Sequence, residues 1–230
     1  MAQLSRTTGI VLRTQNYAET DRIAVLLTPD QGRLDVLAKG ARRLERTSGA
    51  ALDVSNLVEV IFYRRRGLAL LKDVDLKRTF PAIRREIERL TAALEGLAWA
   101  LRLVPKGQPD PAPFQLTLTF LSALEEGTPP EQLTLGYQLR LLSLTGHAPH
   151  LVGCLGCGRE EGLTWSAQRG GFLCRACGGE GETLSPKLIR TMQGLARLPL
   201  PALGRLRVDA ELLEKMEALL LEFREAQLSR

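Results

Sequence analysis

A multi-domain α+β protein is predicted by three features of this 230-residue sequence. The first eighty residues alternate as short strands, the following seventy repeat apolar residues at helical spacing, and all four cysteines lie within one short stretch. An apolar content of 44% and a charged content of 25% are typical of a globular chain rather than a disordered one. We therefore expect a small β-barrel, a helical bundle and a cysteine-bearing insert.

The barrel is predicted from five strand-like runs over residues 1–80. They cover residues 9–14, 22–28, 33–38, 57–63 and 68–76, with a hairpin turn at 29–32. In the fourth run Phe62 alternates with Val58 and Val60, so we assign it to the core. Five strands without a long intervening helix favour a closed barrel, for which an OB-fold is the natural candidate. An SH3-like barrel remains open, because the number of strands alone does not separate the two.

The helical part is predicted to begin near residue 82. The first helix is expected to end before Pro105. Its apolar residues recur at helical spacing and are Ile83, Ile87, Leu90, Leu94, Leu97, Ala98 and Leu101. Two more helices should end at Gly127 and Gly146. Ser185 and Asp209 are N-cap candidates for two further helices. We expect residues 81–150 and 181–230 to form one helical domain, interrupted by an insert at 151–180.

The four cysteines form the most specific motif. Cys154 and Cys157 make one C-x-x-C pair, and Cys174 and Cys177 make another after sixteen intervening residues. This is the spacing of a four-thiolate zinc site, in which tight turns bring both pairs to one tetrahedral ion. With two short strands between the pairs, the segment is predicted to be a zinc ribbon. Four protein ligands leave no position for water, so the single Zn²⁺ should be structural.

Two alternatives to this zinc site are less favoured. Two disulfides are disfavoured because the N-terminal residues lack the apolar run of a secretion signal, so a cytoplasmic location with reduced thiols is expected. His147 and His150, the only histidines in the sequence, precede Cys154 and could enter a mixed ligand set. Four thiolates already complete the coordination of zinc, which makes that arrangement the less favoured one.

Positive charge is concentrated in the predicted barrel. The net charge of the chain is +5, and residues 1–80 alone carry 14 Lys or Arg against 9 Asp or Glu. Two segments supply much of this excess and give the candidate DNA-binding residues: Lys39, Arg42, Arg43, Arg46, Arg64, Arg65 and Arg66. Solvated turns are the ordinary alternative for either segment alone. Two such segments on one barrel favour nucleic-acid contact, with the backbone near Gly40 also able to approach a phosphate.

Catalysis is not indicated by the motifs. The sequence has no Gly-rich phosphate loop and no Ser-His-Asp or Cys-His nucleophile pattern. Glu19 and Asp21 could suggest paired carboxylates, but a capped turn or an ion pair with Arg22 or Arg13 is the preferred interpretation. A metal-dependent nucleic-acid hydrolase and a protein-binding zinc-ribbon scaffold remain as alternative functions. Aromatic residues for base stacking are few, so DNA binding should depend mainly on phosphate contacts and on salt.

The order of these parts resembles the RecO family of bacterial DNA-repair proteins. The most specific local match is the run Gly9-Ile-Val-Leu12, followed by Tyr17-x-Glu19-x-Asp21 and then Ala38-Lys39-Gly40-Ala-Arg-Arg43. The resemblance covers the full length and is densest over residues 7–43 and 151–180. Some members of the family lack the cysteines, whereas this chain has all four.

The resemblance implies a recombination mediator rather than an enzyme. Such a protein binds single- and double-stranded DNA and anneals complementary strands. With RecR it helps to load RecA onto single strands coated by single-stranded DNA-binding protein, whose acidic C-terminal tail it contacts. A cytoplasmic, nucleoid-associated location follows from the same resemblance. The basic bundle residues that could hold the tail are Arg84, Arg85, Arg89, Arg102 and Arg140, among which the sequence does not choose.

Overall fold

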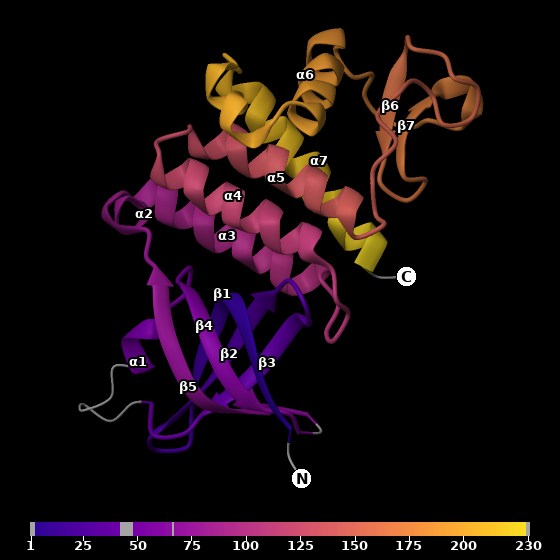
Figure 1. Cartoon of the computed structure of the whole chain (residues 1–230). Coiled ribbons are helices and arrows are strands. Elements are labelled where there is room, and N and C mark those ends of the chain that lie inside the picture. Colours follow the sequence, from indigo (N-terminus) through magenta and orange to yellow (C-terminus); the bar gives the residue numbers. More distant parts are fainter. Residues whose placement is uncertain (1–2, 42–47, 66, 229–230) are drawn as a thin grey trace. The chain divides into compact units, whose positions relative to one another are not determined.

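The computed structural model describes residues 3–41, 48–65 and 67–228. Four of the candidate DNA-binding residues therefore lie outside the described residues: Arg42, Arg43, Arg46 and Arg66. Contacts along the chain group it into two compact units, Met1–Gly127 and Thr128–Arg230. The first unit holds the barrel and the helices α1 to α4, and the second holds the cysteine-bearing segment and the remaining helices (Figure 1).

The barrel consists of five strands. They are β1 (Leu4–Tyr17), β2 (Asp21–Thr28), β3 (Gly32–Ala38), β4 (Leu57–Tyr63) and β5 (Ala69–Arg78), with the short helix α1 (Ser48–Ala51) between β3 and β4. The strands close in the order β1-β2-β3-β5-β4. All neighbours are antiparallel except β3 and β5, which run parallel. The predicted OB-like barrel is confirmed.

Alternation along the strands builds the barrel core. In β4 the residues Val58, Val60 and Phe62 are buried while their neighbours are partly exposed, as the period-2 pattern predicts. A bulge lies between Val11 and Arg13 in β1, where the register with β2 shifts by one residue. The bulge turns Arg13 to the outside of the barrel directly after two buried residues, Val11 and Leu12.

Three helices follow the barrel in the first unit and lie over one of its ends (Figure 1). They are α2 (Pro81–Arg85), α3 (Ile87–Leu103) and α4 (Pro111–Glu125). The expectation of one continuous first helix was wrong, because Glu86 has an extended backbone and separates α2 from α3. The carboxylate of Glu125 accepts hydrogen bonds from the backbone N–H groups of Ala82 and Ile83, which caps α2 as a helix of its own. Ile87 and Leu94, placed on the apolar stripe by the sequence pattern, are 68% and 48% exposed.

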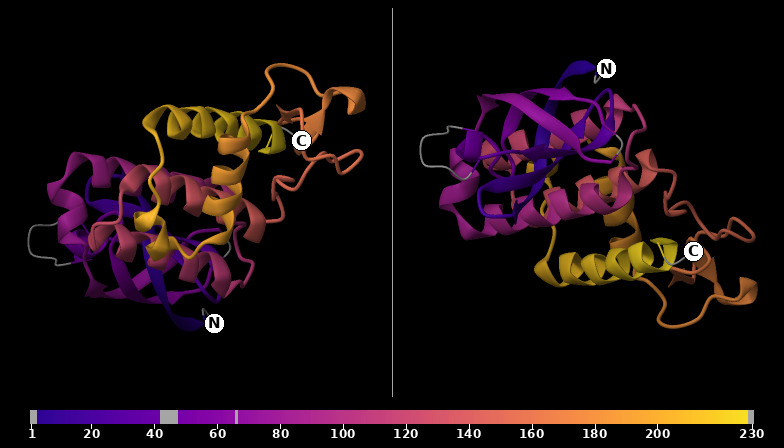
Figure 2. Two further views of the ribbon diagram at one scale, coloured as in Figure 1. Left: turned by 90° about the horizontal axis from the view of Figure 1, so that it is seen from above. Right: turned by 90° about the horizontal axis from the view of Figure 1, so that it is seen from below.

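The second unit contains the helices α5 (Pro130–Leu144), α6 (Pro186–Arg197) and α7 (Ala210–Leu228), and the 3₁₀ turn η2 (Leu200–Arg205). Helix α5 contacts α6, η2 and α7. The Ser185 side chain accepts a hydrogen bond from the N–H of Leu188, which confirms the predicted cap of α6. The backbone carbonyl of Asp209 accepts from Leu212 and Leu213 at the start of α7. The C-terminal end of α7 lies beside the cysteine-bearing segment in both views of Figure 2.

Glycine sets the distance between α3 and α4. A methyl group on Gly96 would overlap the ring of Phe120, which is fully buried in α4. Overpacking of this kind costs about 1–3 kcal/mol, whereas alanine gains roughly 1 kcal/mol of helix propensity over glycine. We expect Gly96→Ala to lower the free energy of unfolding by about 1 kcal/mol. Differential scanning calorimetry would measure it as a lower transition temperature.

Gly194→Ala in α6 is the matched control, since nothing lies within 4 Å of the position of its added methyl group. That change should raise stability by roughly 0.5–1 kcal/mol. If Gly96→Ala stabilised the protein as much as Gly194→Ala, the close packing of α3 on α4 would be wrong.

Candidate metal centre and nucleic-acid interface

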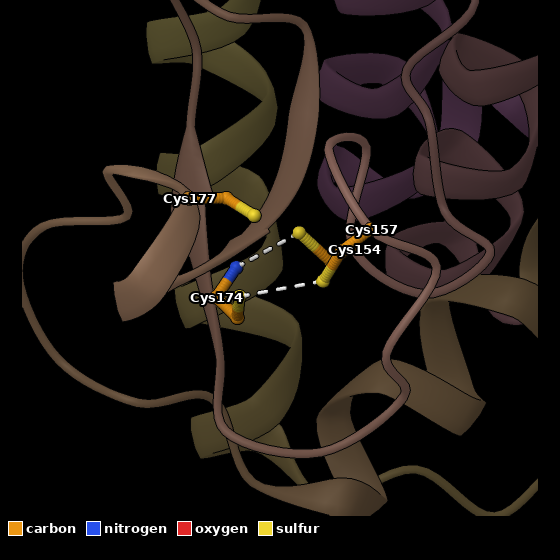
Figure 3. Close-up of side chains that lie close together, drawn as sticks. All are labelled: Cys154, Cys157, Cys174 and Cys177. Carbon is orange, nitrogen blue, oxygen red and sulfur yellow. Dashed lines mark hydrogen bonds between the residues drawn. The ribbon is translucent and has the colours of Figure 1, made fainter.

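The four cysteines come together in the second unit. Cys154 and Cys157 lie in a turn before β6 (Leu163–Ser166), Cys174 ends β7 (Gly171–Cys174), and Cys177 ends the 3₁₀ turn η1 (Arg175–Cys177). Strands β6 and β7 form a two-stranded antiparallel sheet. All four sulfur atoms lie within 4.8 Å of one another (Figure 3). The clustering predicted from the two C-x-x-C pairs is therefore confirmed.

Backbone geometry explains why the turns need glycine. A methyl group on Gly156 would lie 2.9 Å from the sulfur of Cys177, so only glycine lets the first turn approach the second pair. Gly179 is similarly crowded, because an added methyl group would lie 2.7 Å from the carbonyl oxygen of Leu173. The N–H of Gly158 donates to the carbonyl of Cys154 at 2.8 Å and closes the first turn.

The cysteine cluster fits a tetrahedral metal ion. With metal–sulfur bonds of about 2.3 Å, the sulfur atoms of a tetrahedral site are separated by about 3.8 Å. Cys157 and Cys174 have their sulfur atoms 3.7 Å apart, and all four cysteines are free thiols rather than disulfides. Among the described residues, the group of close metal-ligating side chains consists of these cysteines and includes neither His147 nor His150.

Hydrogen bonds shift the pKa of Cys154 and of Cys177 in opposite directions. The backbone N–H of Cys174 donates to the sulfur of Cys154 at 3.3 Å (Figure 3). This bond, together with others that include one from the N–H of Gly156, lowers the pKa of Cys154 to about 6. Hydrogen bonds with the neighbouring sulfurs, that of Cys157 first, raise the pKa of Cys177 to about 12. The hydrogen bonds therefore favour the thiolate of Cys154 and the protonated thiol of Cys177, from which a metal ion would displace a proton.

Aromatic packing attaches this segment to α7. Trp165 in β6 contacts Phe172 edge-on, with ring centroids 5.8 Å apart, and Phe223 of α7 at 5.6 Å. The side-chain amide of Gln227 donates to the carbonyl of Ala167 at 3.1 Å. A disturbed metal centre would therefore also disturb the end of α7.

The described candidate DNA-binding residues lie at neighbouring strand ends of the barrel. Lys39 directly follows β3, and Arg64 and Arg65 directly follow β4; all three are exposed. Leu70 of β5 pairs with Leu37 of β3 on one side and with Tyr63 of β4 on the other. Since strands in a sheet are about 4.8 Å apart, Leu37 and Tyr63 lie about 10 Å apart on either side of Leu70. Because β3 runs parallel and β4 antiparallel to β5, the chain continues from these two points in opposite directions along β5.

The base of the segment after β3 is pinned by two residues at the start of β2. The carboxylate of Asp21 accepts a hydrogen bond from the N–H of Gly40 at 2.8 Å, and the guanidinium of Arg22 donates to the carbonyl of Gly49 at 2.8 Å. The expectation that the backbone near Gly40 is open to a phosphate was wrong for this N–H, because Asp21 occupies it. The spacing of Asp21 and Gly40 in the sequence gives no signal of this contact.

A cleft on the outer face of the barrel was not predicted from the sequence. It is lined by polar residues of β1 and β3 and by two apolar residues of β2, Ile23 and Val25. The sequence of β2 could have indicated this cleft, because apolar residues occupy its outward positions as well as its inward ones.

No helix among the described residues is long and apolar enough to cross a membrane.

Two family descriptions match the chain. "Recombination protein O N terminal" matches residues 1–80, and "Recombination protein O C terminal" matches residues 84–230. The boundary between the two matches falls at the end of β5, where the barrel gives way to α2.

Curated relatives named DNA repair protein RecO match most of the chain. The protein of Rubrobacter xylanophilus is 37% identical over 205 residues, which are 86% of this chain and 82% of the relative. The protein of Symbiobacterium thermophilum is 32% identical over 218 residues, 91% and 86% of the two chains. That of Exiguobacterium sibiricum is 35% identical over 173 residues, 75% and 70%. With both family descriptions matched in order along nearly its whole length, the chain belongs to the RecO family of DNA repair proteins.

Proposed function

We propose that this chain is a DNA-binding mediator of recombinational repair, and that its barrel contacts the phosphate backbone of single- and double-stranded DNA. The observation that supports the proposal is the pairing of β5 with both β3 and β4, so that Lys39 and Arg64 follow strands that flank the start of β5. From the strand spacing and a rise of about 3.3 Å per residue, the two residues are roughly 15 Å apart, within reach of phosphates of one DNA strand. The adjoining residues Arg42, Arg43, Arg46 and Arg66 add to this basic surface in the proposal.

The cysteine cluster is proposed to hold one structural Zn²⁺ per chain through Cys154, Cys157, Cys174 and Cys177. Sulfur is a preferred donor for zinc, and four sulfur ligands leave no position for a reacting water. The ion would cross-link the two cysteine-bearing turns. The contacts of Trp165 with Phe223 and of Gln227 with Ala167 would then hold α7 against this rigid segment.

The partners of the chain are proposed from its family. They are RecR, the RecA recombinase that is loaded onto single strands, and the acidic tail of single-stranded DNA-binding protein. We place the chain in the cytoplasm, associated with the nucleoid. Of the basic residues in the helices, Arg84 and Arg89 are already engaged by carboxylates, Asp53 and Glu86 respectively. These two residues are therefore the less suited to an acidic tail.

A non-enzymatic role is proposed in preference to a metal-dependent hydrolase. A hydrolase needs an open metal position, whereas the close metal-ligating cluster of the described residues consists of four cysteines. A scaffold that binds only protein is the other alternative. Titration of a labelled oligonucleotide at increasing salt separates the three: a scaffold leaves the probe unbound, a hydrolase degrades it, and a mediator binds it with an affinity that falls steeply with salt.

Replacing a cysteine tests the metal centre. Cys174→Ser should abolish stoichiometric zinc and unfold the segment between residues 151 and 180, because structural zinc contributes directly to folding. Elemental analysis of freshly reduced protein measures the zinc, and Trp165 fluorescence reports the contact with Phe223. Arg169→Ala, an exposed change in the same segment, is the control and should keep one zinc per chain. Wild-type protein without zinc, or a Cys174→Ser protein that retains it, would refute the assignment.

Neutralising the segment after β3 tests the phosphate contacts. The double variant Lys39→Ala, Arg43→Ala should weaken binding similarly for all DNA sequences, and each lost contact should flatten the log–log salt slope by about 0.7–0.9. Fluorescence anisotropy at several salt concentrations measures the slope. Arg205→Ala with Arg207→Ala removes the same charge from exposed positions of the second unit and should leave the slope unchanged. An unchanged slope in the folded Lys39/Arg43 variant would remove this segment from the interface.

Strand annealing tests the mediator role. We expect the protein to accelerate the pairing of complementary single strands without nucleotide, because neutralising two phosphate backbones lowers their repulsion. Fluorescence quenching between two labelled oligonucleotides, one precoated with single-stranded DNA-binding protein, measures the rate. Neutral replacement of Arg64, Arg65 and Arg66 together should abolish the acceleration. Pairing no faster than without protein, in a sample that binds DNA, would contradict the proposal.

A further inference from the structure

The outer face of strands β1 to β3 carries a cleft of about 340 Å³ within the first unit. Its floor is made of Ile23 and Val25, two apolar residues on the outside of the barrel. Strand register places polar residues around them: Arg13 pairs with Val25 and Gln15 with Ile23 on one side, and Asp35 pairs with Val25 on the other. The cleft thus combines an apolar floor with a polar rim, as small-ligand sites do.

The walls of the cleft are held in place. Leu101 of α3 and Leu68, which precedes β5, line its two ends. The guanidinium of Arg33 donates to the carbonyl of Leu101, and the N–H of Arg33 donates to the carbonyl of Pro105 at 3.2 Å. The segment after α3 is therefore fixed on β3, and the cleft is preformed.

The accessible polar groups of the rim are hydrogen-bond donors. Arg13 donates to the side-chain oxygen of Gln15, which leaves the amide nitrogen of Gln15 to face a ligand. The one acidic residue of the lining, Asp35, is engaged through one carboxylate oxygen by Lys106 at 2.7 Å, and its other oxygen is buried. Guanidinium groups have five N–H donors, so Arg13 and Arg33 retain donors beyond the bonds that they make within the chain.

The cleft adjoins the basic surface at the barrel end. Leu68 lies only three residues after Arg65, and three residues span at most about 10 Å. A single strand whose phosphates contact Arg64 and Arg65 could therefore turn a base toward Ile23 and Val25. An aliphatic floor contacts the face of a base without the aromatic stacking that is scarce in this barrel.

We propose that this cleft binds one unstacked base of single-stranded DNA and that it prefers thymine to cytosine. The proposal rests on the proposed DNA binding and adds base preference to it. The two pyrimidines differ at C4, where thymine has a carbonyl acceptor and cytosine an amino donor. With C5 against Ile23 and Val25, a rim donor beside C4 pairs with thymine and not with cytosine, whose acceptors N3 and O2 lie farther from C5. The methyl group of thymine also adds apolar contact with Ile23 and Val25.

The test compares homopolymers of about twelve nucleotides by fluorescence anisotropy at one salt concentration. One hydrogen bond of about 1 kcal/mol corresponds to about a fivefold difference in affinity and the methyl group adds about two- to fourfold, so wild-type protein should bind (dT) about ten- to twentyfold more tightly than (dC). Deoxyuridine oligonucleotide, which lacks the methyl group, should bind about two- to fourfold more weakly than (dT). These comparisons use unmodified protein, so they do not depend on the folding of a variant.

Gln15→Glu tests the rim directly. The change keeps the size of an exposed side chain but replaces the donor amide with an acceptor, so the (dT)/(dC) affinity ratio should fall by at least about fivefold. Gln115→Glu in α4 of the same unit adds the same charge at another exposed position and should leave the ratio at its wild-type value. Either added charge weakens the binding of (dT) and of (dC) alike, so this general loss cancels in the ratio of the two affinities.

Three results would overturn the proposal: equal binding of (dT) and (dC) by wild-type protein, a preference unchanged by Gln15→Glu, or deoxyuridine binding as tight as (dT). Salt-dependent binding of all oligonucleotides with no base preference would overturn the proposal that this cleft selects thymine, and it would leave the proposed DNA-binding function intact. Failure to bind any oligonucleotide would overturn the proposed function itself.

Discussion

Closure of the barrel through β5 is the constraint on which the proposed DNA-binding surface depends. Leu70 pairs with Leu37 of β3 and with Tyr63 of β4, so two strands that are far apart in the sequence end on either side of the start of β5. Without this closure the basic residues after β3 and after β4 would be two unrelated charged turns. We propose that with it they act together on DNA, and Leu68, three residues after Arg65, belongs to the cleft on β1 to β3.

The cysteine cluster depends on close backbone approach rather than on hydrophobic burial. The first turn reaches the second pair only because Gly156 has no side chain against Cys177. Backbone N–H groups already favour the thiolate of Cys154, which prepares one ligand before a metal arrives. The contacts of Trp165 with Phe223 join the cluster to α7. The metal centre and the last helix are therefore expected to lose stability together.

The sequence predicted features that follow from local periodicity and spacing. The five strands, the core position of Phe62, the cap at Ser185 and the clustering of the four cysteines all depend on residues close together in the chain, and the structure confirms them. The break at Glu86 was missed because the residue that caps α2, Glu125, lies far along the chain. Ile87 and Leu94 fit the helical period and are nevertheless exposed, since periodicity does not tell which stripe a neighbour covers.

For the candidate DNA-binding site, too, the sequence predicted the residues but not their arrangement in space. The basic residues could be found from composition, but their proximity required the register of β5. The bond of Asp21 to Gly40, which occupies a backbone donor that the sequence left open to phosphate, joins residues 19 positions apart. The cleft required three strands to be aligned, so that Arg13, Val25 and Asp35 meet in one row.

Hydrogen exchange of the whole protein with and without a single-stranded oligonucleotide tests the central claim most directly, namely that the barrel end formed around β5 is the DNA-binding surface. The account predicts slower exchange on DNA binding at the end of β3, at the end of β4 and at the start of β5, with little change in residues 128–228. Protection confined to the cysteine-bearing segment or to helices α5 to α7, with the barrel end unchanged, would contradict it.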